Sequence, residues 1–66
     1  GKFGKSDQAV NAAVNIGAAY FALEEYRDAG EEFQKVVENF GEDPKYSAQV
    51  DFARQQLETL EEARLF

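Results

Sequence analysis

The stretch from residue 9 to residue 23 constrains this chain more than any other, because it carries no charge and only two polar residues, Asn11 and Asn15. Its length and its alanine content favour a helix. A helix that is apolar on almost every side is normally covered on more than one side. In a chain of 66 residues, other helices have to supply that cover. We therefore expect this first helix to lie between helices.

The rest of the chain predicts two more helices and no strand, which makes the expected fold class all-α. The predicted helices cover residues 8–23, 26–40 and 46–64, within one domain of residues 1–66. Residues 26–40 have an apolar and a charged face at helical spacing. A chain of this length forms at most one thin core.

Local signals mark the ends of these helices. Residues 1–6 contain two glycines and no periodicity, so we expect a flexible lead-in, with Ser6 or Asp7 capping the first helix. Gly41 and Pro44 follow the second helix in the order expected beyond a helix end. The connection between the second and third helices is therefore predicted to be a loop.

The third predicted helix has two apolar stripes. The first steps by four and three residues and fits packing on one neighbouring helix; it comprises Tyr46, Val50, Ala53, Leu57 and Leu60. The second lies on roughly the opposite side and has no helix left in the chain to cover it; it comprises Ala48, Phe52, Thr59, Ala63 and Phe66.

We expect a second copy of the chain to cover the second stripe, which makes the protein a homo-oligomer with Phe52, Ala63 and Phe66 in the self-association surface. Domain swapping about residues 41–45 is one route to such an oligomer. Two alternatives stay open, namely packing of the stripe under the first two helices and stacking of a neighbouring repeat.

Glycine inside the predicted helices needs a tertiary explanation, because each one costs about 1 kcal/mol relative to alanine. Gly17 lies in the first helix, and the similarly small Ala29 lies in the second. Small side chains let two antiparallel helices approach closely, and the large Tyr20 and Phe33 fill the space beside the crossing. Gly30 has the same role toward whatever packs on the second helix.

These residues stand at the spacing of the tetratricopeptide repeat (TPR), so residues 10–43 resemble one TPR motif. The matched helix-packing positions are Ala13, Ile16, Gly17, Tyr20, Ala29 and Phe33. The resemblance implies an antiparallel helix-turn-helix motif in a right-handed α-solenoid arrangement, followed by a third amphipathic helix similar to a terminal capping helix. The loop around Pro44 is similar to the longer inter-repeat loop of bacterial periplasmic TPR proteins.

In TPR proteins the first helices line a concave groove, so the resemblance implies that Asn11, Asn15 and Ala18 face the backbone of a bound partner peptide. It implies a non-catalytic protein–protein interaction module that binds a peptide or helix and also self-associates. From the residues alone, the same positions also fit the solvated strip of a buried helix. A structural oligomerisation segment, or a fragment of a longer TPR scaffold, is the alternative for the whole chain.

Charge and residue content disfavour several other functions. The chain has 7 scattered basic and 13 acidic residues, a net charge of -6, which suits neither nucleic acid nor an anionic membrane surface. No apolar run reaches the roughly 18 residues of a membrane span. Adjacent acids such as Glu24 and Glu25 do not converge on a metal ion, and no His or Cys is present to activate Ser6 or Ser47. We therefore expect the chain not to be an enzyme and to bind neither a metal nor a cofactor. A chain without cysteine fits the cytoplasm and the periplasm equally, so the sequence does not indicate its compartment.

Overall fold

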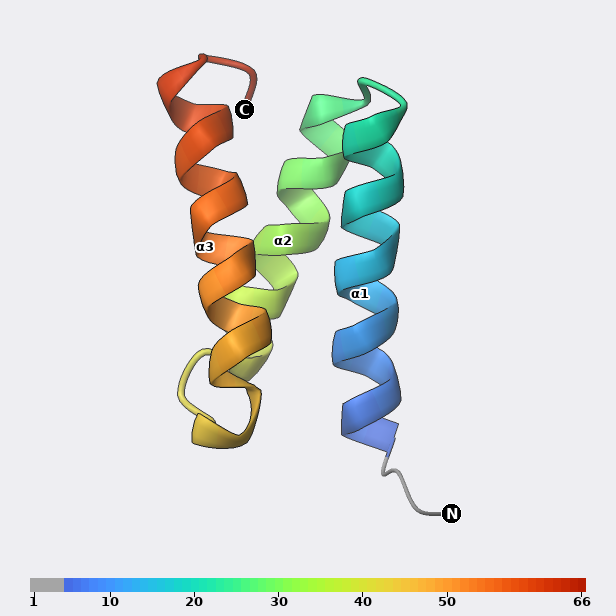
Figure 1. Ribbon diagram of the computed structural model, residues 1–66, viewed down its shortest axis with the longest axis vertical. Helices are drawn as coiled ribbons and strands as arrows, with labels where there is room; N and C mark the ends of the chain where they lie inside the picture. The colour runs from blue at the N-terminus through green and yellow to red at the C-terminus, as the bar shows by residue number, and fades with distance from the viewer. Residues whose placement is uncertain (1–4) are drawn as a thin grey trace.

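The computed structural model describes residues 5–66, with residues 5 and 6 described by their backbone alone, as an all-helical chain. Its helices are α1 (Lys5–Ala22), α2 (Tyr26–Phe40) and α3 (Ser47–Glu62), with a short 3-10 helix, η1 (Pro44–Tyr46), before α3. α1 and α3 run in the same direction, and α2 runs in the opposite direction between them (Figure 1). The prediction of three helices without strands is confirmed over residues 5–66.

The observed helix ends differ from the predicted ones at α1 and α3. α1 begins at Lys5, so residues 5 and 6 of the predicted flexible lead-in are helical, and residues 1–4 lie outside the described part of the chain. Asp7 therefore lies in the first turn of α1 and not ahead of the helix. Pro44 has a fixed φ and no N–H, and it begins η1, so the predicted loop contains a helical turn and α3 begins at Ser47.

The core is centred on α2, whose residues Ala29, Phe33 and Val36 are fully buried at 0% exposure. α1 contributes the equally buried Val10. From η1 and α3 come the buried residues of the first predicted stripe, namely Tyr46, Val50, Ala53 and Leu60. The prediction that this stripe faces a neighbouring helix is therefore confirmed, and the neighbour is α2.

Gly17 lies where the ring of Phe33 meets α1. A Cβ atom added at Gly17 would come within 2.9 Å of Phe33 Cε1 and 3.0 Å of Phe33 Cζ, distances shorter than van der Waals contact between carbon atoms. Gly17 and Ala29 are both buried, as the packing argument requires. Among the other motif positions, Ala13 and Tyr20 are half-buried, whereas Ile16 is 45% exposed and does not belong to the core cluster.

α1 is covered on one side only, which contradicts the expectation that it lies between helices. α2 packs against both other helices, while α1 and α3 make few contacts with each other. The Cα trace measures 38 × 21 × 14 Å, so the helices form a thin slab in which α1 is an outer helix (Figure 1). An apolar pattern shows that cover is favourable, but the pattern does not say whether the same chain supplies it.

The two phenylalanines of the second predicted stripe are partly exposed, yet both contact α2 of their own chain. Phe52 is 39% exposed, and its ring meets that of Phe33 edge-on at a centroid distance of 5.8 Å. Phe66 is 41% exposed and lies over Gly30, where an added Cβ would come within 2.6 Å of Phe66 Cε1. Gly30 therefore accommodates a ring from the end of the same chain.

α1 and α3 end in the same backbone motif. Each helix is followed by a residue with a left-handed backbone, Glu24 at φ 63° and Arg64 at φ 59°. The N–H of Glu25 donates to the carbonyl of Tyr20 at 2.8 Å, and the N–H of Leu65 donates to that of Leu60 at 2.8 Å. This is the Schellman arrangement. Each residue of the motif after α1 has its counterpart after α3 40 positions later, as Glu24 has Arg64. The end of α3 is therefore the structural equivalent of the end of α1 at that offset.

Replacing Gly17 by leucine is expected to lower the free energy of unfolding by about 1–3 kcal/mol, because the new side chain overpacks the contact with Phe33. The measurement is urea unfolding followed by far-UV circular dichroism. Ala18→Leu is the matched control, since Ala18 is the next residue of α1 and is exposed. Equal stability of the two variants would contradict the close approach at Gly17.

Candidate interaction site

Two of the three predicted groove residues lie together at a hollow in the surface. Asn11 and Asn15 are exposed, one turn apart on α1, and line a hollow of about 350 Å³ together with Asp7, Gln8 and Ala12. Ala18 is also exposed, but it lies one turn further along and does not line the hollow. The site therefore presents two amide side chains beside the short apolar side chain of Ala12.

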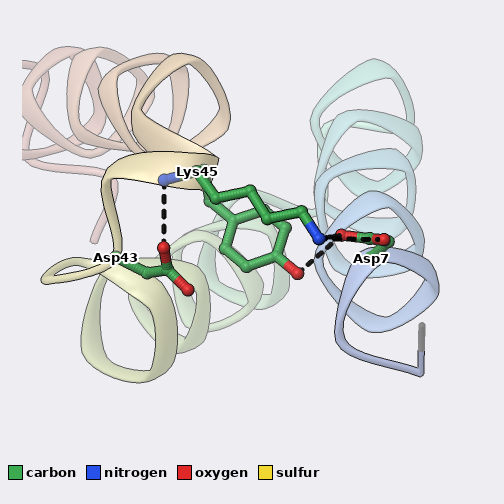
Figure 2. Close-up of polar contacts among 4 residues, drawn as sticks. Asp7, Asp43 and Lys45 are labelled. Atoms are coloured by element: carbon green, nitrogen blue, oxygen red, sulfur yellow. Dashed lines mark hydrogen bonds and ion pairs between the residues drawn. The ribbon is translucent and has the colours of Figure 1, made fainter. Parts of the chain in front are cut away.

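The Asn side chains lie on the same side of α1 as Asp7. Asp7, Asn11 and Asn15 follow one another at steps of four residues, so they form one row along the helix. The first member of this row reaches η1: Lys45 Nζ approaches the carboxylate of Asp7 across the gap between the two elements (Figure 2). We call the two amide residues of this row, Asn11 and Asn15, the amide row.

A polar cluster holds the start of α1 against the α2–α3 connection. The hydroxyl of Tyr46 donates to Asp7 Oδ1 at 2.6 Å, and Lys45 Nζ lies 3.0 Å from the same oxygen. The backbone N–H of Lys45 donates to Asp43 Oδ1 at 3.0 Å, which fixes the turn that presents Lys45 and Tyr46 (Figure 2). The ring of Tyr46 is buried and meets Phe40 edge-on at 5.2 Å.

The contact with Asp7 shifts the pKa values of two groups in this cluster. The pKa of Lys45 is raised above its ordinary value, first by its hydrogen bond to Asp7 and then by the negative charge of that carboxylate. The pKa of Tyr46 is raised, first by the hydrogen bond to Asp7 and then by burial. Both shifts show that the folded chain favours the protonated forms. No sequence signal connects these residues, because Asp7 and Tyr46 are 39 positions apart.

Three further features of the described residues bear on the site. Across the described residues, no three His, Cys, Asp or Glu side chains are grouped so that they could hold a metal ion. A second hollow, of about 620 Å³, lies at the α2–α3 connection, where Glu38, Glu42 and Asp43 share the lining with Arg54. In residues 5–66, none of the helices combines the length and the apolar character needed to cross a membrane.

No protein-family model, curated protein or solved structure matches this chain. The likeness to the TPR family therefore remains an expectation from the residue pattern of positions 10–43.

Replacing Tyr46 by phenylalanine is expected to lower the unfolding midpoint, because the variant keeps the ring against Phe40 and loses the hydrogen bond to Asp7. The difference from the wild type should be constant from neutral pH up to the ordinary tyrosine pKa of 10.0. It should shrink as the pH rises further, because the unfolded chain loses the tyrosine proton before the folded chain does. Urea unfolding at a series of pH values measures this, and a difference that grows at high pH would contradict it.

Proposed function

We propose that this chain is a non-catalytic protein–protein interaction module of the TPR type, which binds an extended peptide or a helix of a partner protein along the amide row of α1. The exposure of Asn11 and Asn15 beside one hollow carries the proposal. An asparagine amide both donates and accepts hydrogen bonds, as does a backbone peptide group. A pair of such amides suits a ligand that is recognised through its backbone.

The spacing of the two amides supports an extended peptide as the ligand. Residues four apart on a helix are about 6 Å apart along its axis. In an extended chain, every second residue presents its backbone groups on the same side, at a repeat of about 6.6–6.8 Å. Asn11 and Asn15 therefore match two peptide groups that are two residues apart in the ligand.

The packing around α1 supports a binding surface that exists before the ligand arrives. Phe33 is fully buried against Gly17 near the middle of α1, and Asp7 is joined to Lys45 and Tyr46 at its start. Both contacts lie beside the amide row and do not use the amides themselves. A preformed surface loses little conformational entropy on binding, which favours affinity for a peptide.

The arrangement of the helices is compatible with a TPR-type unit. In that family an antiparallel pair is followed by the first helix of the next repeat. Here α3 runs parallel to α1, and its end repeats the end of α1 at an offset of 40 residues, which is longer than the TPR period of about 34 residues. We also propose that such units follow one another in a right-handed α-solenoid.

The alternative is a structural oligomerisation segment, or a segment of a longer TPR scaffold, in which copies of the chain or neighbouring repeats are the partners. The partial exposure of Phe52 and Phe66, at 39% and 41%, favours this alternative. Ala63 is exposed beside them on the same predicted stripe. In either case the work of the protein is association, and we assign it no reaction, metal or cofactor.

The groove proposal predicts that peptides selected from a random display library on the wild-type protein lose affinity for Asn11→Ala/Asn15→Ala. Each lost hydrogen bond is worth about 1 kcal/mol, so the double variant should bind roughly tenfold or more weakly in a fluorescence anisotropy titration. N-methylation of the peptide backbone should weaken binding to the wild type in the same way.

Asn39→Ala is the matched control for this experiment, because Asn39 is an exposed asparagine on α2 outside the amide row. It should leave the affinity unchanged. Selected peptides that bind the double variant as tightly as the wild type would reject the amide row as the binding site.

A further inference from the structure

The ring of Phe66 lies in a notch of α2 that exists because residue 30 is glycine. A Cβ atom added at Gly30 would come within 2.5 Å of Phe66 Cγ and 2.6 Å of Phe66 Cε1. The corresponding distance between a Cβ at Gly17 and the ring of Phe33 is 2.9 Å, so Phe66 approaches the helix backbone more closely. A methyl group at position 30 would push the ring away. Gly30 is buried, whereas Phe66 is 41% exposed, so the notch fits a phenyl ring without enclosing it.

The segment that carries this ring lies outside the core. α3 ends at Glu62, and residues 63–66, which we call the strap, are all exposed. The last buried residue of α3 is Leu60, at 0% exposure. Past the left-handed turn, a backbone hydrogen bond from Leu65 to the carbonyl of Leu60 ties the strap to α3. Because the core ends before the strap begins, the strap can open locally while the three helices stay packed.

The closed strap also has a backbone cost. Arg64 has a left-handed φ of 59°, a conformation that is unfavourable for residues other than glycine. Glu24, its equivalent after α1, has the same conformation, but there the chain continues into α2 and Tyr26 packs edge-on against Phe21 at 5.4 Å. At the offset of 40 residues the equivalent of Tyr26 is Phe66, which lies in the notch instead. The cost at Arg64 therefore opposes the contact of the ring with the notch.

We propose that the notch at Gly30 is a binding site for an aromatic side chain of a partner protein, and that Phe66 occupies this site in the free protein. The ring that the notch already holds identifies the chemistry that fits it. The partner's aromatic side chain takes the place of Phe66 when the strap opens. Because only the open form binds, the apparent affinity is reduced by the fraction of molecules that are open. Phe66 is thus an autoinhibitory plug, and this site does not depend on the amide row.

Charge disfavours a second copy of the chain as the source of the ring. The strap follows Glu61 and Glu62, and each chain carries a net charge of -6, so two copies repel each other. Sedimentation velocity over a concentration series checks this point. A wild-type dimer that Phe66→Ala abolishes would assign the notch to a second copy and would overturn the proposal.

N-acetyl-phenylalanine amide is the probe for the notch, because it carries a phenyl ring and no charge. In proton–nitrogen NMR titrations of Phe66→Ala, the amide of residue 30 should shift saturably, and the wild type should need several-fold more probe. Phe66→Ala/Gly30→Ala should show no saturable shift, because the added methyl group fills the notch. N-acetyl-alanine amide is the control probe and should not bind.

Three results of this titration would overturn the proposal. The first is equal affinity of the wild type and Phe66→Ala for the probe, which would show that Phe66 is no competitor. The second is binding to Phe66→Ala/Gly30→Ala as tight as to Phe66→Ala, which would place the probe elsewhere. The third is a loss of helical circular dichroism in Phe66→Ala, which would make the ring part of the core.

Arg64→Gly tests whether the strap controls the notch. Glycine adopts the left-handed conformation without the cost that arginine has, so this variant should hold the strap closed and bind the probe several-fold more weakly than the wild type. Glu24→Gly is the matched control, because it makes the same backbone change after α1 and should leave the affinity unchanged. Equal effects of the two substitutions would show that the strap does not control the notch.

Discussion

The ring of Phe33 is the contact on which the arrangement of the three helices depends. It is fully buried in the middle of α2, it lies against Gly17 of α1, and it meets the ring of Phe52 of α3 edge-on. One side chain thus takes part in both helix interfaces. The absence of a side chain at Gly17 makes this possible, since any Cβ there would collide with the ring. The unfavourable helix propensity of glycine is offset by this packing.

A slab of three helices built around one ring leaves several large apolar side chains exposed, and this follows from its size. A chain of about 60 residues buries only about 60% of the surface that its unfolded form exposes. α1 shows the result, because one side packs on α2 while Ile16 and Leu23 remain exposed. The same helix presents Asn11 and Asn15 on another side. Its two exposed sides therefore differ in chemistry, one apolar and one carrying amides.

At the end of the slab where α1 begins, polar contacts between distant parts of the chain add to the packing of this thin core. Asp7 joins α1 to Lys45 and Tyr46 at the α2–α3 connection (Figure 2). At the other end, Phe66 closes over Gly30 of α2 after the left-handed turn at Arg64. The helices are therefore held together at both ends as well as at Phe33, and the amide row lies on a fixed framework.

The sequence by itself determined the helices and the main packing faces, because helical periodicity is a local property. It predicted the bounds of α2, the buried stripe from Tyr46 to Leu60, and the need for a small residue at Gly17. Only the tertiary structure decided which sides of α1 are covered, because an apolar pattern does not identify its neighbour. It also decided the pairing of Asp7 with Tyr46, since hydrogen bonds between residues 39 positions apart depend on how whole helices pack.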